Sequence, residues 1–128
     1  MVTTTFQYYQ YFYTFHAGEA EQAANGSWIE GRAAWELSAA CREETNGKGT
    51  SIQTADGRTL VFSSLIQLPK GTARVDEGTK VIVTREPVDE AELLNEDFIK
   101  AGKASGLIVA SGTCEKFDAG RLHCRLWI

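Results

Sequence analysis

The chain lacks the cysteine pattern of a secreted disulfide scaffold. It contains three cysteines, an odd number, and no CxxC pair, which is typical of a protein in a reducing compartment. Residues 1–18 have no charged side chain, yet they also lack the basic n-region of a signal peptide. They are too rich in Thr, Gln and Tyr for a membrane span. These absences predict a cytoplasmic protein that does not associate with a membrane.

The sequence also has no surplus of basic residues. Its 13 Lys and Arg residues against 17 Asp and Glu residues give a formal net charge of −4. This balance argues against indiscriminate binding to nucleic acid, because phosphate affinity comes from clustered cations. A glycine-rich strand-to-helix loop for phosphate is missing too. At 128 residues, the chain is predicted to form one domain, 1–128, that can bury a core without disulfides or metal.

Aromatic side chains concentrate near the N-terminus, where all four tyrosines lie between residues 6 and 15. Tyr, Phe and Thr favour extended backbone, so this run predicts a strand. Both of its faces would carry aromatic rings and would need cover. Either the strand packs against the rest of the protein, or it binds a partner or a second copy through Tyr9, Tyr11 and Tyr13. A base-stacking surface and a disordered tail are further interpretations.

A helix is predicted from Ser27 to about Thr45. Ser27 and Glu30 have the spacing of a capping box, in which each side chain accepts a free backbone N–H of the other residue. Apolar residues then follow at helical spacing: Ile29, Ala33, Leu37, Ala40 and Cys41.

From residue 50 the pattern changes to strands. Residues 51–54 and 58–68 flank a turn at Ala55-Asp56-Gly57, and a third strand covers 80–84 after the turn 76–78. The segment Asp89 to Ser105 predicts a helix capped by Asp89, which Asn95 could divide in two.

Two further strands, 107–117 and 121–128, flank Asp118-Ala119-Gly120. The order strand, strand, strand, helix, strand, strand predicts an α+β fold. The predicted fold is a small antiparallel β-barrel over residues 50–128, with the N-terminal strand and helix of residues 1–49 packed on it. This order resembles the OB-fold, and the resemblance implies binding of oligonucleotides or oligosaccharides.

The last turn predicts a register that sets Phe117 opposite Arg121 and Cys114 opposite Cys124, and this register sorts the two faces of the hairpin. One face is apolar and belongs in the core. The other combines cations and aromatic rings at alternate positions: Phe117, Arg121, His123, Arg125 and Trp127. Single-stranded nucleic acid is often held by such a mixture, with cations on phosphates and rings on bases. A solvated sheet face shows the same alternation.

No catalytic or metal-binding arrangement emerges. His123 and Cys124 are neighbours on one strand and point to opposite faces, so they do not form a nucleophile pair or share a metal ion. Glu115 is expected opposite His123, where an ordinary cross-strand ion pair explains it. We therefore expect a non-enzymatic binding module, without cofactor or metal, that binds single-stranded DNA or RNA. The alternative is a protein-interaction or self-associating structural domain that uses the aromatic N-terminal strand.

Overall fold

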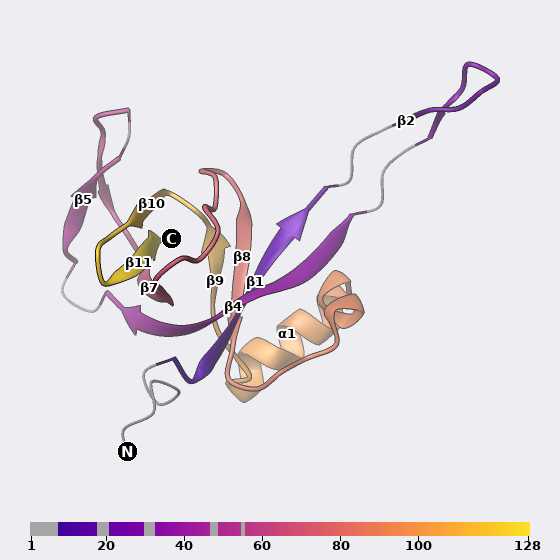
Figure 1. Ribbon diagram of the computed structural model, residues 1–128. Coiled ribbons are helices and arrows are strands. Elements are labelled where there is room, and N and C mark those ends of the chain that lie inside the picture. The colour runs from indigo at the N-terminus through magenta and orange to yellow at the C-terminus, as the bar shows by residue number, and fades with distance from the viewer. Residues whose placement is uncertain (1–7, 18–20, 30–32, 47–48, 55) are drawn as a thin grey trace.

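One strongly curled antiparallel sheet organises the fold (Figure 1). The computed structural model describes residues 8–17, 21–29, 33–46, 49–54 and 56–128. Among these, the seven-stranded sheet has the order β10-β11-β7-β4-β1-β8-β9. Its strands are β1 (Gln10–His16), β4 (Ala34–Thr45), β7 (Ser64–Pro69), β8 (Lys80–Thr84), β9 (Ile108–Thr113), β10 (Lys116–Ala119) and β11 (His123–Trp127).

The α+β class is therefore confirmed, but the sheet forms an open half-barrel with β10 and β9 at its two ends. The expected closed barrel over residues 50–128, with the N-terminal part packed on its surface, is not what forms. Strands β1 and β4 instead lie in the middle of the sheet, so these two strands from the N-terminal part of the chain are part of the barrel wall.

The predicted helix from Ser27 to Thr45 is wrong, because β4 occupies Ala34–Thr45 and a short strand, β3, occupies Trp28–Ile29. Alanines at 33, 34, 39 and 40 fit a helical or an alternating pattern equally well. The outcome is decided by pairing: β4 lies between β1 and β7, and such tertiary contacts override a weak local preference. Glu30, the second residue of the expected capping box, lies outside the described residues.

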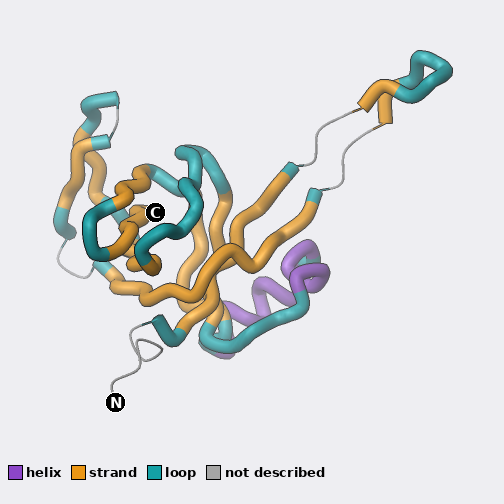
Figure 2. Tube along the Cα trace, viewed as in Figure 1, coloured by secondary structure: helices purple, strands orange, loops and turns teal. Residues whose placement is uncertain are grey.

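Strands β1 and β4 form a long ribbon that leaves the half-barrel (Figures 1 and 2). They pair from Gln10–Cys41 to His16–Ala34, with a bulge between Phe12 and Tyr13. Near its far end, β2 (Glu21–Gln22) pairs with β3. In both figures the β2–β3 end stands well away from the rest of the molecule.

Two hydrophobic cores cover the two faces of the central strands. Phe12 of β1 lies in the inner core enclosed by the curled sheet, with Ile66, Leu68 and Leu126. Its neighbour Tyr13 belongs to a second core with Trp35, Ile82, Leu93 and Ile108. The 3₁₀-helix η2 (Glu90–Leu94) and the helix α1 (Glu96–Ser105) contribute to this second core from outside the sheet. The part of the aromatic run from Tyr11 to Phe15 thus has cover on both faces.

The short-range predictions between residues 50 and 106 are mostly confirmed. The hairpin of β5 (Ser51–Gln53) and β6 (Thr59–Val61) has the expected Ile52–Leu60 pairing. The helical segment is divided at Asn95, whose side chain caps α1 while Asp89 caps η2. Gly106 ends α1 in the left-handed conformation, with φ of 82°, which glycine adopts at little cost.

The expected strand from Arg58 to Leu68 is interrupted, so β6 and β7 belong to different sheets. At the break, the Asn46 side chain donates to the Phe62 carbonyl oxygen at 2.7 Å. The Ser63 N–H donates to the Ile128 carbonyl oxygen at 2.7 Å. These two contacts from distant segments redirect the chain after β6, and β7 then pairs with β4 and β11.

The C-terminal hairpin has a different register from the one predicted. The expected strand 107–117 divides into β9, which pairs with β8, and β10, which pairs with β11. Phe117 lies opposite Leu126, five residues beyond its expected partner Arg121, and Cys124 lies opposite Ala119 instead of Cys114. Because the shift is an odd number of residues, it exchanges the two faces of β10 relative to β11.

Candidate functional site

The outer face of β4, β7, β11 and β10 carries most of the predicted nucleic-acid-binding residues. Its side chains form two rows across the four strands: Arg42, Gln67, Arg125 and Asp118 in one, and Glu44, Leu65, Trp127 and Lys116 in the other. His123 lies on the same face of β11, two positions before Arg125. Arg121 precedes β11, and its side chain is exposed.

Phe117 does not belong to this face. It packs in the inner core opposite Leu126 and is 8% exposed. The expected set of five residues is therefore divided, because the register shift turns Phe117 inward. Lys116, which the sequence analysis did not select, takes a place beside Trp127 on the outer face.

Charged side chains of both signs surround the buried Trp127 ring on the outer face. The Lys116 ammonium lies 5.4 Å, and the Arg125 guanidinium 5.5 Å, from the centre of the Trp127 ring. Trp127 is only 8% exposed, and Arg125 forms an ion pair of 2.8 Å with Asp118. On this face two cations lie over the indole ring. One of them, Arg125, is already paired with the carboxylate of Asp118.

The three tyrosines selected as partner-binding residues have different environments. Tyr9 lies before β1 and is 57% exposed, whereas Tyr11 packs against the second core. Tyr13 is 1% exposed. Its hydroxyl accepts a hydrogen bond from the Val88 N–H at 3.0 Å, which links β1 to the segment before η2. Tyr13 is a core residue, so its side chain is not on the surface of the molecule.

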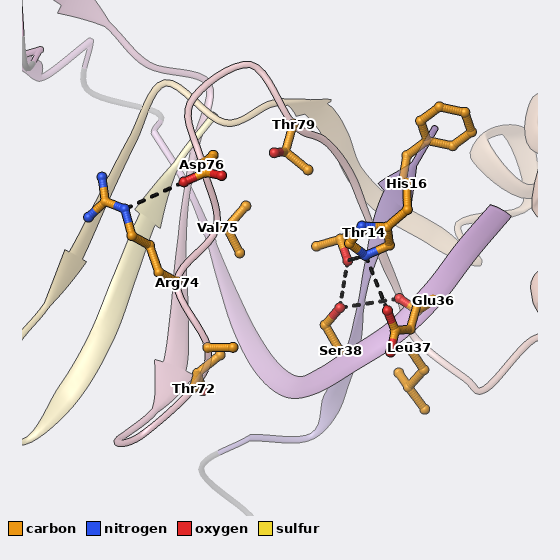
Figure 3. Close-up of a pocket in the computed structure, with 12 residues that line it drawn as sticks. Thr14, His16, Glu36, Leu37, Ser38, Thr72, Arg74, Val75, Asp76 and Thr79 are labelled. Atoms are coloured by element: carbon orange, nitrogen blue, oxygen red, sulfur yellow. Dashed lines mark hydrogen bonds and ion pairs between the residues drawn. The ribbon is translucent and has the colours of Figure 1, made fainter. Parts of the chain in front are cut away.

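A pocket of about 310 Å³ with polar and apolar lining residues lies where the β1–β4 ribbon leaves the inner core (Figure 3). Thr14 and His16 of β1 and Glu36 and Ser38 of β4 form one wall. The loop of residues 72–79 between β7 and β8 forms the other. We call this site the barrel-mouth pocket. His16 had no predicted role from its sequence position, although Phe12, Thr14 and His16 share one face of β1 and become more polar toward the ribbon.

A chain of hydrogen bonds runs along the ribbon wall of the pocket. Thr14, which is 3% exposed, has its hydroxyl oxygen 2.6 Å from Ser38 Oγ and 3.0 Å from His16 Nε2. His16 Nε2 also lies 3.2 Å from Glu36 Oε2. Because Thr14 and Glu36 meet the same nitrogen, the group is not arranged as a catalytic triad, which uses both ring nitrogens.

The loop wall of the pocket, residues 72–79, contacts the inner core. Val75 is buried there, and the Cys114 thiol donates to the Val75 carbonyl oxygen at 3.8 Å. The Cys124 thiol donates to the carbonyl oxygen of Thr72 at 4.0 Å. At the pocket surface, Arg74 and Asp76 form an ion pair of 3.6 Å. The loop therefore has a defined position relative to the ribbon.

The cysteines are structural groups in this fold. All three are free and buried. Burial, and then the charge of Glu43, raises the pKa of the Cys41 thiol to about 12. Burial, followed by the charge of Glu77, raises the pKa of Cys114 to about 11. Both thiols stay protonated at neutral pH and are poor nucleophiles. Within the described ranges, no three His, Cys, Asp or Glu side chains are grouped to hold a metal ion.

Comparisons with known proteins find no match: no family model, no curated protein and no solved structure resembles this chain closely enough to assign a relationship. Among the described residues, none of the helices has the length and apolar character needed to cross a bilayer. The functional interpretation therefore rests on the geometry of this chain.

Proposed function

We propose that this chain is a non-enzymatic protein-interaction module that self-associates through the hairpin of β2 and β3, residues 21–29, at the end of its ribbon. We call this segment the arm. The observation that carries the proposal is the position of β2 and β3, which pair with each other and stand away from both cores (Figure 1). β8 supports the ribbon only as far as Thr14.

An isolated two-stranded hairpin is marginally stable in water, because it has no third layer on which to bury side chains. β2 and β3 each contain two residues and belong to no larger sheet. β3 has the sequence Trp28–Ile29, two large apolar residue types, and tryptophan is enriched among residues that dominate binding energy. Packing on another protein would give such a hairpin a further layer on which to bury apolar residues.

Charge favours a second copy as the partner. The whole chain has a net charge of −4, so two copies repel each other unless they meet through neutral surface. Residues 22–27 at the end of the arm, Gln-Ala-Ala-Asn-Gly-Ser, have no charged side chain. Symmetric homo-oligomers are also the commonest assemblies of soluble proteins. The tip of one arm can therefore meet a second copy without bringing like charges together, whereas Glu21 in β2 must stay outside that contact.

The test is the solution mass of the full chain between about 5 and 200 µM, measured by sedimentation or light scattering. A variant in which Asn-Gly replaces residues 17–33 retains the His16–Ala34 pair and closes it with a two-residue turn. We expect the full chain to associate as concentration rises. The shortened chain should stay monomeric and should keep the circular dichroism spectrum of a folded β-sheet.

Trp28→Ser provides a single-residue version of the same test and should weaken association by about tenfold or more. The matched control is Val61→Ser, which removes another apolar side chain, 62% exposed on β6, and should leave the mass unchanged. A full chain that is monomeric at the highest concentration contradicts the proposal. Equal association of the armless chain also contradicts it.

Single-stranded nucleic-acid binding is the second candidate, and one observation favours it. Lys116 and Arg125 both lie over the Trp127 ring, on the same face of the sheet as His123. The Arg125–Asp118 pair and the small exposed area of the indole weigh against it. Arg121 adds one exposed cation at the start of β11.

An oligothymidine titration at about 50 mM salt, followed by tryptophan fluorescence, tests this candidate. Binding should quench the signal, and Lys116→Gln should weaken it. Arg58→Gln is the control, because Arg58 pairs with Asp56 at an exposed turn between β5 and β6. An unchanged signal at micromolar protein removes the candidate.

A further inference from the structure

The barrel-mouth pocket has the size and chemistry of a small-ligand site. Its volume is about 310 Å³, at the lower end of the range of about 300–1,000 Å³ for small-molecule pockets. Pockets in the mouths of β-barrels are a common location for such sites. A ligand that fills this one has the size of a single sugar ring.

The ribbon wall of the pocket carries polar side chains at positions next to the apolar inner core. On the inner face of β1, Phe12 is followed by Thr14, and both are almost fully buried. The Thr14 hydroxyl connects Ser38 and His16 in one hydrogen-bonded chain. Hydroxyls and an imidazole both donate and accept hydrogen bonds, so this wall can meet a ligand group of either kind.

Charge in the pocket excludes a simple anion site. The guanidinium of Arg74 is already paired with Asp76, and the other carboxylate, Glu36, lies beside His16 (Figure 3). A carboxylate or phosphate would therefore meet two negative groups and no unpaired guanidinium. A cation would meet carboxylates that already have partners, because Glu36 lies beside His16 and Asp76 is paired with Arg74. Carboxylates and hydroxyls together are well suited to neutral hydroxyl groups, which donate to the former and exchange hydrogen bonds with the latter.

The two walls are also held in place before any ligand arrives. The Gly78 N–H donates to the Cys114 carbonyl oxygen at 2.9 Å, and the Cys114 N–H donates to the Thr79 carbonyl oxygen at 2.8 Å. Together with the thiol contacts to Val75 and Thr72, these bonds tie the loop wall to Cys114, directly after β9, and to Cys124 in β11. A pre-formed pocket loses less conformational entropy on binding.

We propose that the barrel-mouth pocket binds a neutral, polyhydroxylated small molecule of monosaccharide size between Thr14 and Ser38 on one wall and the loop of residues 72–79 on the other. This site is separate from the arm, so it stands or fails independently of self-association.

The experiment is a titration of the ¹⁵N-labelled full chain, followed by amide chemical shifts. The probes are D-glucose, D-galactose and myo-inositol, with sodium acetate and methylamine as charged comparisons. At least one polyol should give saturable shifts at Thr14, Ser38 and Thr79, with a Kd on the order of 1–10 mM. Thr14→Val, which keeps the branched shape and removes the hydroxyl, should weaken binding by about tenfold.

Ser38→Ala is the second variant and decides the result if Thr14→Val does not fold, because Ser38 is exposed. Thr59→Val, on the exposed face of β6, is the matched control and should bind like the unaltered chain. The proposal is overturned by the absence of saturable shifts with all three polyols up to about 50 mM. Equal binding by Ser38→Ala, or tighter binding of acetate or methylamine, also overturns it.

Discussion

Gly102 is a buried residue of α1 that limits how closely the helix approaches β9. A Cβ atom added there would lie 2.9 Å from Ile108 Cδ1 and 3.0 Å from Ile108 Cγ1. Ile108 is itself 5% exposed in the second core, so it has little room to move. Two effects therefore compete in Gly102→Ala. Alanine favours the helix by about 0.8–1.0 kcal/mol, whereas overpacking a core costs about 1–3 kcal/mol.

We expect the steric effect to exceed the helical preference, so Gly102→Ala should lower the free energy of unfolding by about 1 kcal/mol. Ile108→Val removes the nearest atom, Cδ1, and alone should cost about 0.5–1.5 kcal/mol. Because it makes space for the new methyl group, the double variant should be more stable than the sum of the single effects by about 0.5–1 kcal/mol.

Urea unfolding, followed by tryptophan fluorescence and circular dichroism, measures all three variants with their m-values. Ala101→Gly is the control, because Ala101 is exposed on the same helix and reports the helical preference without a packing change. If Gly102→Ala stabilises the protein by as much as Ala101→Gly destabilises it, the close approach to Ile108 has no energetic effect and the reasoning is refuted.

Three further outcomes follow from single contacts. Tyr13→Phe should destabilise the fold by about 1–2 kcal/mol in urea unfolding, because a buried N–H loses its acceptor, while Tyr9→Phe should change stability by less than about 0.5 kcal/mol. Burial raises the pKa of Cys41 in the folded protein from 9.0 to about 12. The contribution of the protonated thiol to the free energy of unfolding is therefore complete below pH 9 and is lost as pH rises toward 12. Stability should therefore fall between pH 9 and pH 11, and fall less in Cys41→Ala, as thermal unfolding at each pH will show. Glu90→Ala should speed hydrogen exchange at the Leu37 amide about tenfold by NMR, because the Glu90 carboxylate accepts that N–H at 3.2 Å.

Features decided by one or two neighbouring residues were predictable from the sequence. Asp89 and Asn95 each accept a backbone N–H two residues ahead, and Gly106 takes the left-handed conformation that ends α1. The β5–β6 hairpin forms because Thr54 and Arg58 pair across a short turn that contains Gly57 at φ of +86°. In each case the physical cause lies within a few residues, so no distant segment can change the result.

Features decided between distant segments were not predictable. The alanine-rich stretch around Ala34–Ala40 is compatible with a helix or a strand, and its strand partner β1 lies about twenty residues or more away in the sequence. The barrel-mouth pocket was missed for the same reason. Its ribbon wall joins Thr14 to Ser38, and its loop wall comes from residues 72–79. Only the pairing of β1 with β4 and β8 brings them together.

The last hairpin shows how one long-range constraint determines which surface the protein presents. Ile128 exchanges backbone hydrogen bonds with Ser64, which holds the end of β11 against β7. The Glu115 N–H then meets the Trp127 carbonyl oxygen at 2.8 Å, and β10 must start there. A tight turn at Asp118 would have required β11 to begin earlier. The chain instead passes through Gly120, where an added Cβ would lie 2.7 Å from the His123 carbonyl oxygen. The odd shift that results places Phe117 inside and Lys116 beside the indole. A partner that binds this face would therefore contact Lys116 and Arg125 rather than the buried Trp127 ring beneath them.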